Sequence, residues 1–295
     1  MKHIFAFILA AITTVASATT QVPIVWPFAP GSNQANAIRM TIEQANKAQS
    51  KYQFVFENKP GAGGVVAVNY VLNSPKPAIL YMSTSFFVRP MFYPLNESWD
   101  VNAFEPVAIA ATGSPLVLLS KNVSSIEDIR KKAQFTIGMS NGSITEVVAR
   151  KVQEALPGVK VLLVPYPNTI AATRDMMGGH VDASVEFFND AMPWVDSNAA
   201  KVVAITGSKN QQGFVTFKSQ GVAGLDSVLS NFYMLMSNKT SPALVQELHE
   251  ILDKAAATEE VTHVWRADLG TTGRRTLEMT QKFWNLQVHY WRPRN

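Results

Sequence analysis

Short apolar runs alternate with amphipathic stretches along most of the chain, and clusters of Gly, Pro, Ser and Asn separate them. Apolar runs bounded by such turn residues are typical of buried strands, whereas apolar positions three and four residues apart are typical of helices. The pattern predicts strands at residues 21–28, 52–56, 78–82, 104–111, 115–120, 134–137, 160–164 and 232–236. It predicts helices at residues 35–45, 65–72, 243–257 and 276–290, a short helix after residue 124, and two more that end at residues 152 and 177.

Strands that alternate with helices predict an α/β fold with largely parallel sheets, in which ligands bind at the carboxyl ends of the strands. The Gly/Ser loop at residues 138–143 follows a strand and precedes a helix, so we interpret it as the start of a second α/β domain. The chain is expected to cross between domains near residues 118–121 and again near residues 230–236. Such a two-crossing hinge allows two lobes to close on a ligand. We predict lobe 1 at residues 19–119 plus 232–295 and lobe 2 at residues 120–231.

Three glycines stand at one strand-to-helix junction, in the stretch Lys59-Pro60-Gly61-Ala62-Gly63-Gly64. Glycine allows a positive φ and lets a ligand or another chain approach the bare backbone. The unpaired amides at the start of the following helix favour an anion. A dinucleotide fingerprint would require glycine where Val66 stands, and no Gly-Lys-Ser/Thr of a P-loop follows. Taken alone, the stretch is equally compatible with a tight turn that packs a helix on a strand.

The motif Asn-Lys-Pro-Gly-Ala-Gly-Gly at residues 58–64 resembles one in the solute-binding receptors of tripartite tricarboxylate transporters, the Bug-type periplasmic proteins. Three other places fit the same family. They are Pro-Phe-Ala-Pro-Gly at residues 27–31 with Arg39, Tyr166 followed by Gly-Gly-His-Val-Asp at residues 178–182, and the Ser-Pro helix start at residues 241–242. Residues 191–194 and 200–207 match the next helix and strand of the family, so the resemblance spans most of the chain.

The resemblance implies a two-lobed periplasmic binding protein, or Venus-flytrap, with two α/β domains. It implies a monomeric receptor that captures a small organic anion, most simply a carboxylate, and delivers it to membrane transporter subunits. A role as the ligand-binding subunit of a sensor stays open. No enzymatic activity, cofactor, metal or nucleic-acid partner is expected. The chain departs from the family pattern at Ser32 (Gly expected), at Ala35 (Asp expected) and at Pro167-Asn168 (Lys-Gly expected). The missing acidic residue at Ala35 weakens the case for an amino-acid ligand.

The predicted ligand site lies in the cleft between the lobes, where amides and hydroxyls would replace the hydration of a carboxylate. No Arg clamp is evident in the ligand loops, so dipoles and bridging waters are expected to hold the charge. Phe28 and Tyr166 would shape the site and exclude water, and Ser83, Thr84 and Ser85 fit a carboxylate or a helix N-cap equally well. The full set is Phe28, Gly31, Ser32, Asn33, Ser83, Thr84, Ser85, Ser140, Asn141, Gly142, Ser143, Tyr166, Asn168 and Thr169.

The first residues are typical of a secretory signal: a short basic start, an apolar run at residues 4–15 and Ala16-Ser17-Ala18 as a cleavage site. We expect cleavage after Ala18 and a periplasmic mature protein; an uncleaved anchor or a buried helix is the alternative. The absence of cysteine excludes disulfides, thiolate metal sites and cysteine nucleophiles. A net charge of +4 comes from scattered basic residues without the interleaved aromatics of a nucleic-acid groove, and it favours an anionic ligand.

One motif indicates catalysis instead. Residues 138–142 are Gly-Met-Ser-Asn-Gly, which matches the Gly-x-Ser-x-Gly nucleophile elbow of α/β-hydrolases. Triad partners exist downstream in the required order, namely Asp175 or Asp182 and then His249, His263 or His289. No His-Gly oxyanion motif precedes the elbow, and the same residues suit an anion-binding helix N-terminus. The alternative function is therefore a secreted serine hydrolase that uses Ser140.

Overall fold

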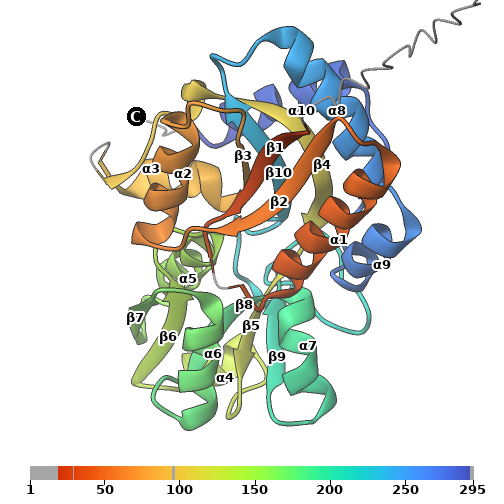
Figure 1. The fold of residues 1–295 in the computed structure, drawn as a ribbon. Helices are drawn as coiled ribbons and strands as arrows, with labels where there is room; N and C mark the ends of the chain where they lie inside the picture. Colours follow the sequence, from red (N-terminus) through yellow and green to blue (C-terminus); the bar gives the residue numbers. More distant parts are fainter. Residues whose placement is uncertain (1–18, 29, 95–96, 293–295) are drawn as a thin grey trace, which may run out of the picture.

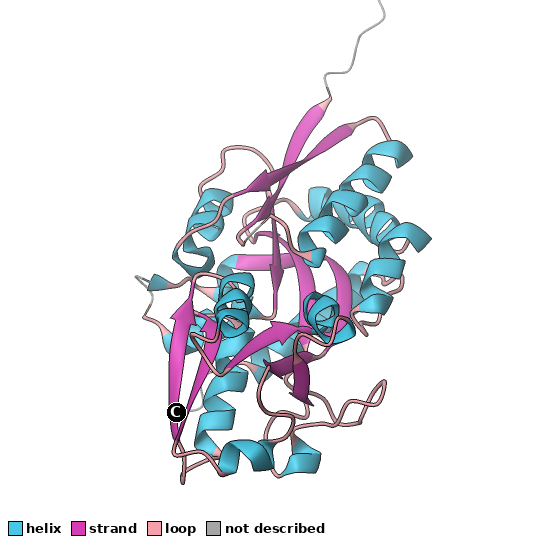
Figure 2. Cartoon of the chain, turned by 90° about the horizontal axis from the view of Figure 1, so that it is seen from below, coloured by secondary structure: helices cyan, strands magenta, loops and turns pink. Residues whose placement is uncertain are grey.

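The computed structural model describes residues 19–28, 30–94 and 97–292. The predicted signal peptide lies outside the described residues. Two five-stranded sheets, each covered by its own helices, form two lobes that are stacked one above the other in Figure 1. Helices lie on both sides of the strands in the perpendicular view (Figure 2). The predicted two-lobed α/β fold is confirmed.

The first lobe holds a sheet with the strand order β2-β1-β3-β10-β4. Its strands are β1 (Thr20–Trp26), β2 (Tyr52–Asn58), β3 (Ile79–Ser83), β4 (Phe104–Ser114) and β10 (Ser230–Ser237). Its helices are α1 (Asn33–Ala48), α2 (Val65–Leu72), α3 (Ser85–Phe92), α8 (Pro242–Ala256), α9 (Glu259–Ala267) and α10 (Leu277–Tyr290). The predicted elements are present with shifted ends, and α3 and α9 are additional helices that the pattern did not predict.

The second lobe holds a sheet with the strand order β7-β6-β8-β5-β9. Its strands are β5 (Leu116–Ser120), β6 (Gln134–Ser140), β7 (Lys160–Tyr166), β8 (Ala183–Phe187) and β9 (Lys201–Ile205). Its helices are α4 (Ile126–Arg130), α5 (Ile144–Glu154), α6 (Thr169–Gly178) and α7 (Phe188–Asp196). β6 runs three residues further than predicted, so Ser140 stands at the end of a strand and not within the loop.

Each sheet runs four strands in one direction and one in the other. The reversed strand is β10 in the first sheet, antiparallel to β3 and β4, and β5 in the second, antiparallel to β8 and β9. These two are the strands that follow the crossings between lobes. The predicted first boundary, at residues 119/120, would leave most of β5 in lobe 1, whereas β5 pairs within the second sheet. The lobe boundaries remain a prediction, and the pairing favours a first crossing near Pro115.

The aromatic segment at residues 90–94 is bounded by two prolines, which is typical of a loop, but its first half is helical. α3 continues through Pro90 as far as Phe92. Proline lacks the N–H that would bond the carbonyl of the residue four positions earlier, which is Phe86. The indole Nε1 of Trp99 donates to that carbonyl oxygen at 3.0 Å in its place. The helix tolerates proline because a side chain from outside the helix replaces the missing donor.

The two lobes are packed against each other. One apolar cluster of buried side chains includes Met82 and Phe87 from the first lobe together with Ile144 and Val148 from the second. The ends of β3 and β6, where polar residues follow apolar strands, therefore meet at the same junction. Within the part of the chain that the structure describes, no helix combines the length and the apolar character needed to cross a bilayer.

Candidate functional site

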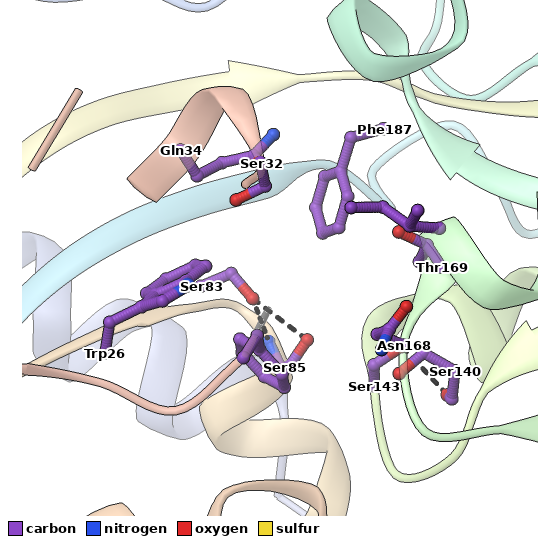
Figure 3. Close-up of a pocket in the computed structure, with 12 residues that line it drawn as sticks. Trp26, Ser32, Gln34, Ser83, Ser85, Ser140, Ser143, Asn168, Thr169 and Phe187 are labelled. Atoms are coloured by element: carbon purple, nitrogen blue, oxygen red, sulfur yellow. Dashed lines mark hydrogen bonds between the residues drawn. The ribbon is translucent and has the colours of Figure 1, made fainter. Parts of the chain in front are cut away.

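A cavity lies between the lobes, with about 430 Å³ of space including its opening to solvent (Figure 3). The first lobe lines it with Trp26, Phe28, Ser32, Gln34, Ser83 and Ser85, and the second with Ser140, Ser143, Asn168, Thr169, Ile170 and Phe187. Figure 3 shows Ser83 and Ser85 on one side of this inner cavity and Ser140, Ser143 and Asn168 on the other. The lining combines hydroxyl and amide groups with aromatic rings, and none of its described residues carries a formal charge.

Three helices begin at the inner cavity, each with a lining residue as its N-cap. Ser32 Oγ accepts from the Ala35 amide in α1 at 3.2 Å. Ser143 Oγ accepts from the Thr145 amide in α5 at 3.2 Å. Asn168 Oδ1 accepts from the Ala171 amide in α6 at 2.9 Å. The N-terminus of a helix carries a partial positive charge, and its free amides bind anions. Three such ends at one cavity favour an anion there, although some of their first amides, such as those of Asn33 and Ile144, already have partners.

The serines at the end of β3 connect the two lobes. Ser83 Oγ donates to Ser85 Oγ at 2.9 Å, and the amide of Ile144, the first residue of α5, donates to Ser85 Oγ at 3.1 Å. Ser85 therefore lines the cavity and also satisfies a free amide of a helix in the opposite lobe. Thr84 points elsewhere: it donates to the Leu229 carbonyl and accepts from the Asn231 amide. These hydrogen bonds hold the chain at the second crossing between lobes, where β10 begins.

Eight of the fourteen predicted ligand residues line the inner cavity: Phe28, Ser32, Ser83, Ser85, Ser140, Ser143, Asn168 and Thr169. Asn141 and Tyr166 line an adjoining outer cleft of about 1290 Å³ including its open mouth, which shares Phe28 and Asn168 with the inner cavity. Gly31, Asn33, Thr84 and Gly142 belong to the lining of neither. Ligand binding by these fourteen residues stays a prediction.

Sequence reasoning missed Trp26, Gln34, Ile170 and Phe187. Trp26 and Phe187 are the last residues of β1 and β8, so the rule that places ligands at the carboxyl ends of strands could have found them. Gln34 and Ile170 lie in the first turns of α1 and α6, next to predicted residues. Only their side-chain direction, which depends on the helix position, brings them to the cavity.

A cluster of buried carboxyl groups joins the lobes beside the cavity. Asn33 of α1 donates to Asp190 Oδ1 of α7 through its amide at 3.2 Å and through Nδ2 at 2.8 Å. A second contact has its donor in the second lobe: the Asn189 amide of α7 donates to Asp268 Oδ1 of the first lobe at 2.8 Å. Burial raises the pKa of Asp190 and of the neighbouring Glu186, and it raises the pKa of Asp268 to about 7. The hydrogen bonds from Asn33 and Asn189 favour the ionised carboxylates, whereas burial favours the protonated groups and is the larger effect on both pKa values.

Two of the residues proposed for a serine hydrolase, His249 and Asp175, have other hydrogen-bond partners. His249 lies within 2.7 Å of the Val107 carbonyl oxygen and 3.0 Å of that of Arg275, and no described histidine lines the cavity of Ser140. Asp175 accepts from the Tyr166 hydroxyl at 2.8 Å, which helps to raise the pKa of that phenol to about 12 after the larger effect of burial. Among the described residues, no group of three His, Cys, Asp or Glu side chains forms a candidate metal site.

Two α/β lobes around a polar cavity define the class of two-lobed binding proteins. Residues 38–269 match the tripartite tricarboxylate transporter family receptor, and the chain belongs to that family. It is 26% identical over 282 residues to the UPF0065 protein in the tcbD-tcbE intergenic region of Pseudomonas sp. (strain P51), covering 88% of this chain and 83% of that protein. The protein is thus a solute-binding receptor and not an enzyme, and family members are periplasmic binding proteins.

Solved structures share the fold at low identity. The periplasmic binding protein BugD superposes with a TM-score of 0.80 at 23% identity, covering 92% of this chain and 95% of that one. R. palustris Rpa4515, solved with adipate, superposes with a TM-score of 0.79 at 21% identity, covering 93% of this chain and 95% of that one. Both comparisons support the two-lobed architecture.

Proposed function

We propose that this receptor captures a small organic acid, as its carboxylate, in the cavity between the lobes and delivers it to a tripartite tricarboxylate-type membrane transporter. The observation that carries the proposal is the convergence of three capped helix N-termini, those of α1, α5 and α6, on one uncharged cavity. Such an arrangement attracts an anion while leaving it free to dissociate again. The adipate in the similar R. palustris structure supports the carboxylate class.

Binding replaces the water around the carboxylate with hydroxyl and amide donors of both lobes. Each neutral hydrogen bond contributes about 0.5–1.5 kcal/mol net, so several are needed for useful affinity. The rings of Trp26, Phe28 and Phe187 would contact the apolar body of the acid and exclude water. Because the donors come from both lobes, the ligand stabilises the closed arrangement over an open one. We further propose that the chain is exported, with cleavage after Ala18, and acts as a monomer.

A panel of small carboxylates is expected to stabilise the refolded mature protein in a thermal-shift assay. A ligand at 100 times its Kd should add about 2.7 kcal/mol to the free energy of unfolding. Ser85→Ala should reduce that stabilisation, because Ser85 lines the cavity and accepts from the Ile144 amide of the other lobe. Ser197→Ala is the matched control, since the Ser197 hydroxyl is exposed and bonds within its own helix turn. If no acid shifts the transition of the refolded protein, the proposal is wrong.

A further inference from the structure

Arg89 is a buried cation that has no carboxylate partner among the described residues. Its side chain is only 5% exposed, and its Nε donates to the Glu97 carbonyl oxygen at 2.6 Å. Its guanidinium lies 4.5 Å from the centre of the Tyr93 ring. Its Nη1 is buried and has no hydrogen-bond partner among the described residues, and no ion pair between described residues includes Arg89. A buried charge without a counter-ion is unfavourable, so the site is best completed by an anion.

Arg89 stands next to the proposed ligand site. It lines the outer cleft and is the one charged side chain among the described residues that line either the outer cleft or the inner cavity. Phe28 and Asn168 line both spaces, so the two adjoin at these residues. A molecule held in the inner cavity can therefore extend past Phe28 and Asn168 toward Arg89.

Two glycines from opposite lobes leave room for the guanidinium. A Cβ atom on Gly63 would lie 2.3 Å from Arg89 Nη1, and one on Gly142 would lie 2.5 Å from it. Both glycines have a positive φ, +62° and +70°, which is the region that glycine adopts without strain. The Gly-Ala-Gly-Gly stretch and the loop after β6 thus enclose the same cationic group, and that group is positioned when the lobes are together.

We propose that Arg89 binds a second carboxylate, so that the preferred ligand is a dicarboxylate. One carboxylate is held by the hydroxyls and helix N-termini of the inner cavity, and the other pairs with the guanidinium in the outer cleft. This inference rests on the proposed function, because it assigns the chemical class of the same ligand. The predicted ligand loops contain no Arg clamp because Arg89 lies outside them, on α3 directly before Pro90.

Isothermal titration of acid pairs of equal length tests the inference, with adipate against hexanoate and succinate against butyrate. The wild-type protein is expected to bind the better diacid at least tenfold more tightly than its monoacid. Arg89→Gln should weaken diacid binding by about 10- to 100-fold, the loss typical of a charge-assisted hydrogen bond, and should change monoacid binding less than threefold. Arg89→Lys keeps the charge without the planar fork and should fall between the two.

Arg266→Gln is the matched control. Arg266 is an exposed cation that pairs with Glu259 of the same helix, and it lines neither space. Circular dichroism and the unfolding midpoint establish that each variant is folded. An equal affinity of the wild type for diacids and monoacids, or an equal loss of both in Arg89→Gln, would overturn the inference and leave the proposed function standing. A wild-type protein that binds no carboxylate at all would overturn both.

Discussion

Gly63→Val is expected to lower the free energy of unfolding by about 3–5 kcal/mol, because a β-branched residue is placed in the left-handed region and its side chain meets the Arg89 guanidinium. Its Cβ would also lie 3.2 Å from the Asn141 carbonyl oxygen of the second lobe. Closing the lobes around that carbonyl therefore becomes harder, and carboxylate affinity should fall about tenfold or more. Urea denaturation and calorimetric titration measure the two effects.

Gly213→Val is the matched control for that substitution. Gly213 has a similar backbone, with φ of +83°, but a Cβ there would meet no atom within 4 Å. It should show the backbone strain alone, about 1–2 kcal/mol, and leave affinity unchanged. Equal losses of stability and of affinity in the two variants would mean that Gly63 is needed only for its φ and not for the contact between lobes.

Asp268→Asn is expected to raise the free energy of unfolding at pH 8 by about 2–4 kcal/mol, because it removes a buried carboxylate while keeping an oxygen that can accept from Asn189. Asp268 is 2% exposed, and burial raises its pKa to about 7 in spite of the hydrogen bond from the Asn189 amide. The neighbouring Asp190 carboxyl raises it further.

The sign follows from the two states. The unfolded carboxyl has a pKa of about 3.9, so below that pH it is protonated in both states and contributes no difference. Between pH 4 and pH 7 the unfolded chain ionises while folded Asp268 keeps its proton, so the wild type loses stability as pH rises. Above pH 7 the loss is complete. The gain of Asp268→Asn should accordingly be negligible near pH 4 and largest above pH 7, as chemical denaturation at each pH would show.

Asp128→Asn provides the opposite case. Hydrogen bonds from Ser125 and Ser124 at the start of α4 hold the pKa of that carboxyl below its ordinary value. Replacing it should reduce stability at neutral pH and make no difference once the pH falls below its folded pKa. A gain at pH 8 in both Asp variants would indicate a general effect of reduced negative charge and would contradict the role given to burial at Asp268.

The strand-loop-helix units could be predicted from the sequence because the signals for them are local. Apolar runs, a following Gly/Pro/Ser loop and a Ser or Asn cap lie within a few residues of one another, as at Ser32, Ser143 and Asn168. The rule for the carboxyl ends of strands then brings these loops to one place. Eight of the predicted ligand residues, Ser83 and Ser140 among them, consequently line one cavity.

Other features depend on partners that are distant in the sequence. α3 passes through Pro90 because the Trp99 indole supplies the missing donor, and a local pattern cannot show that contact. Thr84 and Ser85 are adjacent and similar, yet one bonds the second crossing while the other bonds α5 of the opposite lobe. β5 belongs to the second sheet because it pairs with β8 and β9, and a local pattern does not show that pairing either.

By itself the sequence determined the alternation of strands and helices, the two-lobed architecture and the family, since these follow from periodicity, turn residues and sequence motifs. Only the tertiary structure decided which polar groups converge: the meeting of Asn33 with Asp190 and of Asn189 with Asp268, and the placing of Arg89 between Gly63 and Gly142. Burial and charge pairing depend on what surrounds a group in space, and that is set when the two lobes come together.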